Sequence, residues 1–309
     1  MMLGRSWMTP EAAWLDLTAR LRRNSIQSGE PGNFAACVAG LVVALWDLAA
    51  RKAGMPLWQA LGRADTPTPL LAYASNLNPK GAPEVVAQCR ERGYRAFKMK
   101  VGFDLASDLD NVRRIVSRLK ADEHFMIDAN QAWNLASART AVEAFSQYPL
   151  GWIEEPICAD EPTELWAELA MISRVPLAGG ENVMGLAEFE ALIRSRHLSV
   201  IQPDICKWGG LSGCRMVAKR IVAAGLGYCP HWLNSGIGLH AAAHLLSAVG
   251  GTGMLEHDAM ENPLQSVLAE PLPRLADGHF AVTATPGLGV EPDLKAAKTF
   301  LEAHRDLRP

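Results

Sequence analysis

From about position 70 onward, hydrophobic residues occur in short runs that are separated by longer amphipathic stretches. Leu70 begins the first run, and the later runs are centred near Phe97, Ile127, Ile153, Leu177, Ile201, Tyr228 and Leu255. A spacing of roughly 26 residues is what one strand, one helix and two loops require. Eight strands with intervening helices predict a parallel α/β barrel rather than an open sheet.

The flanking parts of the chain do not follow this repeat. Thr9 and Pro10 are the expected N-cap and first residue of a helix. A second helix, predicted over 33–52, is apolar on most faces and should be buried. Its longest apolar run, 34–46, is too short to span a bilayer. Residues 263–309 contain several prolines and are expected to fold back over another part of the molecule. We therefore predict a helical N-terminal part over 1–65, a barrel over 66–262 and a returning segment over 263–309.

Composition narrows the class of protein. Of the 309 residues, 49% are hydrophobic and 20% are charged, which permits a large core and excludes wholesale disorder. The net charge is −3 and no long basic run accompanies it, so nucleic acid is not an expected partner. The first residues lack the apolar stretch of a signal peptide, and six dispersed cysteines are expected to be reduced thiols. We expect a cytoplasmic protein.

Ionisable residues follow the predicted strands at the point where each strand ends. In a barrel, chemistry is carried out at the C-terminal strand ends. One such residue is usually a helix cap or a solvated charge, but a whole series in register indicates a site. The series comprises Lys98, Lys100, Asp128, Glu154, Glu181, Asp204, His231 and Glu256.

Three of these residues predict a metal site. Asp128, Glu154 and Glu181 follow three successive strands. Three converging carboxylates need a cation, because like charges raise one another's pKa. Oxygen ligands without Cys or His favour Mg²⁺ over Zn²⁺.

The remaining residues are candidates for acid–base chemistry. Lys98 and Lys100 are two positions apart on a strand, so both side chains point the same way. Lys98 would neutralise the carboxylates and lower the pKa of Lys100, which would make Lys100 a usable base. Asp204 orienting His231 is a common acid–base pair. Glu256, if protonated, could donate a hydrogen bond to an oxyanion.

Other motifs have structural interpretations. His240 and His244 share one helix face, but Ala follows His240 where a zinc protease has Glu, so we expect them to pack within the fold. Trp133 follows a strand end, and lining the pocket and packing in the core are both open to it.

Taken together, the paired lysines, Asp128-Ala-Asn130, Trp-Ile-Glu154-Glu155-Pro and the later strand ends resemble the enolase superfamily. Within it, they are most similar to the mandelate racemase subgroup, over residues from about 33 to 300. The resemblance implies an α/β fold, a modified TIM barrel of the (β/α)7β type with a capping domain, and an essential Mg²⁺.

The resemblance also implies roles for individual residues. Glu154, rather than Glu155, would bind the metal together with Asp128 and Glu181. Lys100 would act as base on one face of the substrate, and His231, paired with Asp204, on the other. The expected substrate-binding residues are Asn130, Asn182, Lys98, Glu256 and Trp133.

The implied reaction begins with removal of the proton α to a carboxylate. We expect dehydration of a sugar acid to a 2-keto-3-deoxy acid by a hydro-lyase. The first alternative is racemisation or epimerisation of a 2-hydroxy acid or related carboxylate. The second alternative is a non-catalytic or weakly active truncated barrel. A small carboxylate is the expected partner, with no nucleic acid and no membrane, and the chain should form a homo-oligomer.

Similar proteins usually begin with a three-stranded antiparallel sheet, and no corresponding strands are predicted within 1–65. We therefore expect a truncated α+β cap whose apolar residues, among them Trp7, Trp14, Leu17 and Leu21, lack a packing partner.

Overall fold

The computed structural model describes residues 4–233, 235–270, 272 and 275–302. Its N-terminal part consists of helices α1 (Pro10–Ser28), α2 (Pro31–Lys52) and α3 (Leu57–Ala60). The Thr9 side chain accepts a hydrogen bond from the Ala12 backbone N–H and so caps α1 as predicted. Gly29, in the left-handed conformation with φ of 71°, ends this helix.

Strands and helices then alternate along the chain. The strands are β1 (Leu70–Leu77), β2 (Ala96–Lys100), β3 (His124–Asp128), β4 (Ile153–Glu154), β5 (Leu177–Gly179), β6 (Val200–Ile201), β7 (Gly227–Tyr228) and β8 (Leu255–Asp258). The helices between them are α4 (Ala82–Glu91), α5 (Leu105–Val116), α6 (Leu135–Phe145), α7 (Thr163–Ile172), α8 (Leu186–Ser195), α9 (Gly210–Ala223) and α10 (Gly236–Val249). The predicted strand centres all fall within or beside these strands, so the predicted βα repeat is confirmed.

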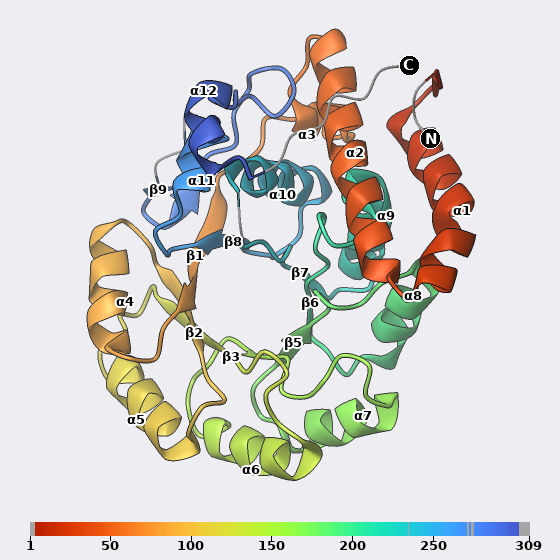
Figure 1. The fold of residues 1–309 in the computed structure, drawn as a ribbon. Helices are drawn as coiled ribbons and strands as arrows, with labels where there is room; N and C mark the ends of the chain where they lie inside the picture. Colours follow the sequence, from red (N-terminus) through yellow and green to blue (C-terminus); the bar gives the residue numbers. More distant parts are fainter. Residues whose placement is uncertain (1–3, 234, 271, 273–274, 303–309) are drawn as a thin grey trace.

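The strands follow one another around a ring, with the helices outside it (Figure 1). Parallel pairing runs without interruption from β8 through β1 and β2 to β7. No backbone ladder joins β7 and β8 within the described ranges. The Met254 N–H instead donates to Cys229 Sγ at 3.2 Å. A Cβ on Gly253 would lie 1.7 Å from the Tyr228 carbonyl oxygen, so the two segments pass very close to each other.

The C-terminal segment packs against the first strand of the repeat and against the N-terminal helices. It contains α11 (Pro263–Val267), β9 (Leu275–Ala276), β10 (His279–Phe280), α12 (Leu294–Ala297) and the 3₁₀ turn η1 (Lys298–Phe300). β10 pairs antiparallel with β1, which makes the sheet mixed. The Leu57 N–H donates to the Gly287 carbonyl at 2.8 Å, and the Leu288 N–H donates to Asp47 Oδ1 at 2.7 Å. The segment therefore packs against α2 and α3.

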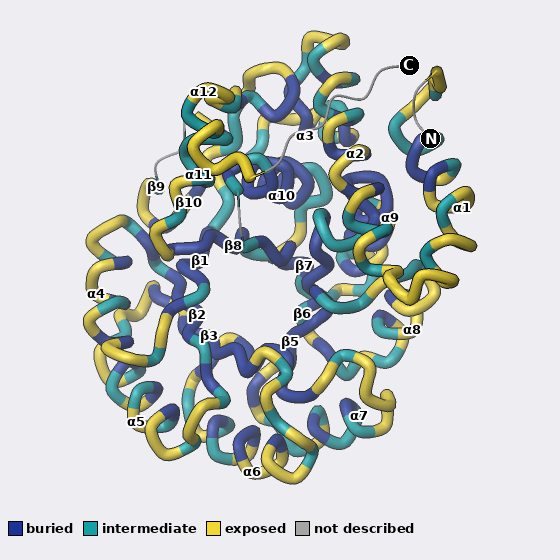
Figure 2. The backbone as a smooth tube through the Cα atoms, in the orientation of Figure 1, coloured by how far each residue is buried: buried dark blue, intermediate teal, exposed yellow. Residues whose placement is uncertain are grey.

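Burial follows the two faces of the strands. Figure 2 shows buried strands at the centre and exposed outer faces on the helices. On β2, Phe97 and Met99 pack into the large core between strands and helices. Ala96, one position earlier, packs with Tyr73 and Trp152 in a smaller separate cluster. Lys98 and Lys100 share the face of Ala96 because strand side chains alternate.

The expectation that the N-terminal apolar residues lack a partner is wrong for two of them. Trp14 and Leu17 are buried, 4% and 1% exposed. The Trp14 ring meets Trp208 edge-on, with ring centroids 6.0 Å apart, and lies against Gly213 of α9. Helix α9, rather than a preceding sheet, covers this face of α1. Trp7 and Leu21 are half-buried against the same core.

The cysteines and the apolar helix α2 are relevant to the expectation of a cytoplasmic protein. All six cysteines are free. Helix α2 has 22 residues and a window of mean hydropathy 1.8, so by length and composition it could cross a membrane. The prediction that the apolar stretch is too short to span a bilayer considered only residues 34–46, whereas the helix extends over Pro31–Lys52. This is weak evidence for a span, since the core helix of a soluble protein passes the same test. Only 33% of the apolar window is buried, including Val38, Val42 and Trp46, so the expectation that this helix is buried holds for one face alone.

Candidate active site

The C-terminal ends of neighbouring strands bring the predicted polar side chains together. In the parallel register, Lys100 lies opposite Asp128, and Asp128 lies opposite Glu154. Lys100 Nζ is 2.7 Å from Asp128 Oδ2. Burial acts to raise the pKa of Asp128, but Lys98 and Lys100 outweigh it and hold that pKa below its usual range. The ring therefore places these residues side by side, as predicted.

Lys98 is a fixed positive charge within the ring. Its Nζ lies 2.5 Å from Glu154 Oε1, 2.9 Å from Glu256 Oε1 and 3.6 Å from Asp128 Oδ2. Burial disfavours its charged form, but the carboxylates of Glu154 and Glu256 outweigh burial and raise the pKa of Lys98 well above its usual value. Lys98 thus stays protonated, which suits an electrostatic role rather than that of a base.

Glu154 is the most confined of the three predicted metal ligands. Its Oε2 accepts hydrogen bonds from Gln202 Nε2 at 2.7 Å and from Trp152 Nε1 at 2.9 Å. Burial, and then the nearby charge of Asp128, raise the pKa of Glu154 to about 8, although Lys98 acts in the opposite direction. A buried carboxylate with this balance of charges gains stability from a further cation.

Glu181, His231 and Asp204 form a hydrogen-bonded row. His231 Nδ1 is 2.7 Å from Asp204 Oδ2, and His231 Nε2 is 2.8 Å from Glu181 Oε2. The backbone N–H groups of Cys206 and Lys207 donate to Asp204 Oδ1 at 2.6 and 3.0 Å and orient this carboxylate. The predicted Asp–His pair is therefore formed, with the aspartate held in place by its own loop.

The same row shifts the proton affinities of His231 and Glu181. Burial opposes the charged form of His231, but Glu256, Asp204 and Glu181 outweigh it and raise the pKa of the imidazole. Burial would raise the pKa of Glu181, yet the hydrogen bond and charge of His231, with Lys207, hold it well below its usual range. An imidazolium facing a carboxylate is the state that this geometry favours.

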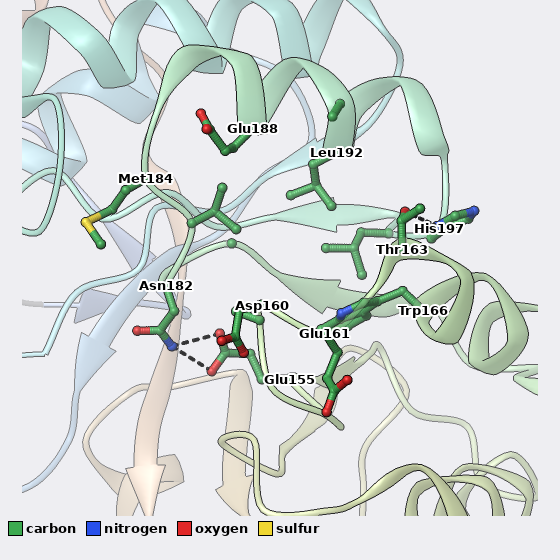
Figure 3. Close-up of a pocket in the computed structure, with 15 residues that line it drawn as sticks. Glu155, Asp160, Glu161, Thr163, Trp166, Asn182, Met184, Glu188, Leu192 and His197 are labelled. Atoms are coloured by element: carbon green, nitrogen blue, oxygen red, sulfur yellow. Dashed lines mark hydrogen bonds between the residues drawn. The ribbon is translucent and has the colours of Figure 1, made fainter. Parts of the chain in front are cut away.

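Asn182 bridges two carboxylates rather than facing open space. Its Nδ2 donates to both oxygens of Glu155, at 2.9 and 3.0 Å, and to Glu181 Oε1 at 3.2 Å. Its Oδ1 accepts from Lys207 Nζ at 3.1 Å, and Lys207 also reaches Glu181 Oε1 at 3.0 Å. Figure 3 shows Asn182 and Glu155 pointing toward each other. Burial, and then the charge of Glu181, raise the pKa of Glu155 to about 7.

A cavity of about 370 Å³ adjoins this bridge (Figure 3). Glu155 and Asn182 are among its lining residues, and Trp166 and Leu192 contribute apolar walls from α7 and α8. It therefore lies between the helices outside the ring.

Three further residues that were predicted to bind substrate have different surroundings from one another. Glu256 Oε2 accepts the Trp232 backbone N–H at 3.0 Å, and Oε1 faces Lys98, so both oxygens face donors. The Asn130 N–H donates to Asp128 Oδ1 at 2.8 Å, while its side chain is exposed. Trp133 stacks on Phe145 of α6, with ring centroids 6.1 Å apart. Of the two interpretations left open for Trp133, packing against the core therefore describes its contacts.

Four residues that contact predicted site residues were not themselves predicted from the sequence. Trp152 and Gln202 hold Glu154, and Glu155 and Lys207 hold Asn182. Trp152 and Gln202 each precede a predicted site residue by two positions, so strand alternation would have placed them on the same face. Lys207 and Glu155 lie in loops after β6 and β4, where no periodicity indicates direction.

The three carboxylates fit a hard cation by their chemistry. Asp128, Glu154 and Glu181 are buried and supply only oxygen ligands. As they stand, no group of three or more His, Cys, Asp or Glu side chains in the described part of the chain is close enough to hold a metal. Lysine and histidine nitrogens contact their oxygens instead. Metal ligation by these residues therefore stays a prediction.

Comparison with known proteins finds related sequences and structures. A family model described as "Enolase C-terminal domain-like" matches residues 83–297. A mandelate racemase/muconate lactonizing enzyme from Bordetella bronchiseptica has a similar solved structure, with 48% identity and a TM-score of 0.92 over 96% of this chain and 82% of that one. A racemase from Streptomyces coelicolor, solved with bound magnesium, is 29% identical with a TM-score of 0.84, over 96% of this chain and 80% of that one.

The curated relatives carry several reaction names. The 3,6-anhydro-alpha-L-galactonate cycloisomerase of Streptomyces coelicolor is 30% identical over 95% of this chain and 79% of its own length. Other relatives are named D-galactonate dehydratase, in Cronobacter sakazakii, and N-succinyl-L-Arg/Lys racemase, in Bacillus cereus. These similar proteins thus include lyases, cycloisomerases and racemases.

Proposed function

This chain belongs to the enolase superfamily, and from that premise we propose that it removes the proton α to the carboxylate of a sugar acid and expels the β-hydroxyl as water. The product would be a 2-keto-3-deoxy acid, and the enzyme a carbon–oxygen lyase on a modified (β/α)7β barrel. Dehydratase names among the relatives support this choice.

The observation that carries the proposal is the order of residues around the ring. Lys100 ends β2, and His231 follows β7. Strands β3 and β4, which end in Asp128 and Glu154, and β5, which precedes Glu181, lie between them in the ladder. Two groups able to move protons therefore flank one group of carboxylates, which suits a substrate approached from two sides.

The donor set supports Mg²⁺ as the cofactor. Asp128, Glu154 and Glu181 would hold the ion, and their burial and mutual charge are the conditions under which a divalent cation stabilises carboxylates. When bound, Mg²⁺ supplies Lewis-acid polarisation of a carboxylate oxygen.

The chain's own residues would divide the proton movements. Lys100 Nζ would take the α-proton as the C–H bond breaks, and the electron pair forms the new double bond as the β C–O bond breaks. His231, kept protonated by its carboxylate neighbours, gives its proton to the departing hydroxyl, which leaves as water. The enol product then becomes the 2-keto acid. Lys98 lends positive charge to the substrate carboxylate throughout. General-base catalysis by Lys100 accounts for about 10²–10⁴-fold of the rate, or roughly 3–5 kcal/mol.

Ring-opening elimination is a second candidate, because two of the curated relatives are named cycloisomerases. The same proton removal would then expel a β-oxygen that belongs to a ring of the substrate, and no water would leave. Return of a proton by His231 to the opposite face would instead give racemisation or epimerisation.

The test is a set of aldonic and aldaric acids and their anhydro and lactone forms, incubated with enzyme and Mg²⁺ in D₂O. Proton NMR reports α-proton exchange, and semicarbazide detects 2-keto acids. We expect Lys100→Ala and His231→Asn to abolish product formation, whereas Lys219→Met, at an exposed site on α9, retains it. Keto acid without ring opening supports dehydration, and exchange with inversion but no keto acid supports racemisation. Neither exchange nor product from any acid, or full activity in either active-site variant, would refute the proposal.

The cellular setting also belongs to the proposal. We expect a cytoplasmic homo-oligomer that acts on a small carboxylate and binds neither nucleic acid nor membrane. The net charge of −3 and the reduced thiols support this setting.

A further inference from the structure

Glu181 differs from the other two predicted metal ligands in how its oxygens are held. At Glu154, Oε2 accepts from two neutral donors, Gln202 and Trp152, and Oε1 accepts from the buried Lys98. At Glu181, Oε1 accepts from Lys207 Nζ at 3.0 Å and from Asn182 Nδ2 at 3.2 Å. Oε2 faces His231 instead. One oxygen is therefore held by residues of the surrounding loops, while the other faces the acid–base residue.

The orientation of the Asn182 amide is determined by its neighbours. Lys207 can only donate, so the atom it contacts must be Oδ1. The Glu155 carboxylate, which is 1% exposed, takes the Nδ2 group with both oxygens. With its two ends fixed in this way, Asn182 can present its Nδ2 to Glu181 in one orientation only.

We propose that Lys207, Asn182 and Glu155 form a positioning chain that holds Oε1 of Glu181 and thereby sets the affinity of the site for Mg²⁺. The proposal rests on the proposed function, since it assumes that Glu181 binds the ion. It assigns Lys207 and Glu155, for which the sequence predicted no role, to the positioning of a metal ligand. Asn182, expected to contact substrate, becomes a positioning residue as well.

The physical reason is preorganisation. A carboxylate with two or more free rotamers loses entropy when it is fixed by a metal, and hydrogen bonds made beforehand reduce that loss. Lys207 can supply this restraint at small electrostatic penalty, because its side chain is 42% exposed and solvent screens its charge. Glu155 and Asn182 are less exposed to solvent, so they form the more rigid part of the positioning chain.

The opposite interpretation makes an opposite prediction. If Lys207 only occupies the place of the metal charge, then it competes with Mg²⁺ for Glu181. Removing its ammonium would then strengthen Mg²⁺ binding, whereas removing a positioning group weakens it. The sign of the change in dissociation constant separates the two.

The experiment is titration calorimetry of Mg²⁺ into the purified full chain, repeated with Mn²⁺. We expect Lys207→Met to weaken binding by about 10–100-fold, as is usual for groups that orient metal ligands. Lys207→Arg keeps a cationic donor and should recover most of the affinity. The control, Lys219→Met, removes an exposed lysine from the neighbouring helix α9 and should leave the dissociation constant unchanged.

A second variant tests the connection through Asn182. Glu155→Ala frees the amide and should also weaken Mg²⁺ binding. The double variant with Lys207→Met should lose less affinity than the product of the two single effects, because both act on one carboxylate. Tighter binding by Lys207→Met, or a lowered melting temperature with an unchanged dissociation constant, would overturn the positioning chain. Wild-type protein that binds no Mg²⁺ would overturn the proposed function together with it.

Discussion

His244 provides a measurable link between burial and the pH dependence of stability. It lies in α10 and is fully buried. Its Nδ1 accepts the Trp58 N–H at 3.1 Å, and its Nε2 lies 3.2 Å from the Leu288 carbonyl oxygen. Because a backbone N–H can only donate, the ring must be neutral with its proton on Nε2. One imidazole thus connects α10 to α3 and to the C-terminal segment.

The expected magnitude follows from the shift in proton affinity. Burial lowers the pKa of His244 to about 3, and burial likewise lowers that of His240, one turn earlier, to about 4. In the unfolded chain both would titrate near the ordinary value of about 6.5. Between these values only the unfolded state takes up the proton, so stability falls as the pH falls. Each group contributes about 1.4 kcal/mol per pH unit, or roughly 2 kcal/mol at pH 5.

The perturbation is His244→Asn, which keeps an acceptor for the Trp58 N–H but cannot be protonated. It should lower stability at pH 7.5, because it loses ring packing and the Leu288 contact. Between pH 7.5 and 5, however, it should lose roughly 2 kcal/mol less than wild type. Urea unfolding at several pH values measures both effects. His124→Asn, at an exposed site, is the matched control. Equal pH dependence for wild type and His244→Asn would refute the reasoning.

Two further predictions concern stability away from the site. Glu123 is buried, and its carboxylate accepts hydrogen bonds from Arg90 Nε at 2.6 Å and Nη2 at 2.8 Å. Burial acts to raise the pKa of Glu123, but the hydrogen bonds from Arg90 outweigh burial and lower this pKa. Glu123→Gln should therefore lower the free energy of unfolding by about 1–3 kcal/mol near neutral pH. This difference from wild type should shrink in acid, where the wild-type carboxylate loses its charge, and an undiminished difference in urea titrations at low pH would contradict the prediction. Gly253→Ala should lower the melting temperature by several degrees, because its Cβ would overlap the Tyr228 carbonyl, whereas Gly40→Ala, within helix α2 and with nothing within 4 Å of the new Cβ, should not lower it. Equal melting temperatures for these two glycine variants would show that the approach of β7 and β8 is not tight.

The βα repeat could be predicted because it depends on local periodicity. Leu177 and Ile201 each belong to a strand of only two or three residues, yet the flanking apolar spacing located both. Asp128 and Glu154 could be placed together because the C-terminal ends of parallel strands share one end of the ring. These statements need no knowledge of the packing between distant elements.

The partners of individual side chains could not be predicted in the same way. The pattern of α1 shows which face is apolar but not which element covers it, and Trp14 packs on α9 rather than on a sheet. Lys207 lies three residues after Asp204, in a loop whose direction depends on Asp204 accepting two backbone N–H groups. Long-range contacts of this kind are set by the packing of elements that are distant in the sequence rather than by the neighbours in sequence.

The charges at the site offer an independent argument for a divalent cation. Buried carboxylates gather there, among them Asp128, Glu154, Glu155, Glu181, Asp204 and Glu256. They face four cationic groups, namely Lys98, Lys100, Lys207 and the imidazole of His231, whose pKa is raised. Carboxylates therefore outnumber the cationic groups that face them. Without such an ion, burial and mutual repulsion favour protons on two carboxyls, and the pKa is raised to about 8 for Glu154 and about 7 for Glu155. Burying this many carboxylates is costly unless cations offset their charge, so the arrangement supports the proposal that this site binds a divalent ion.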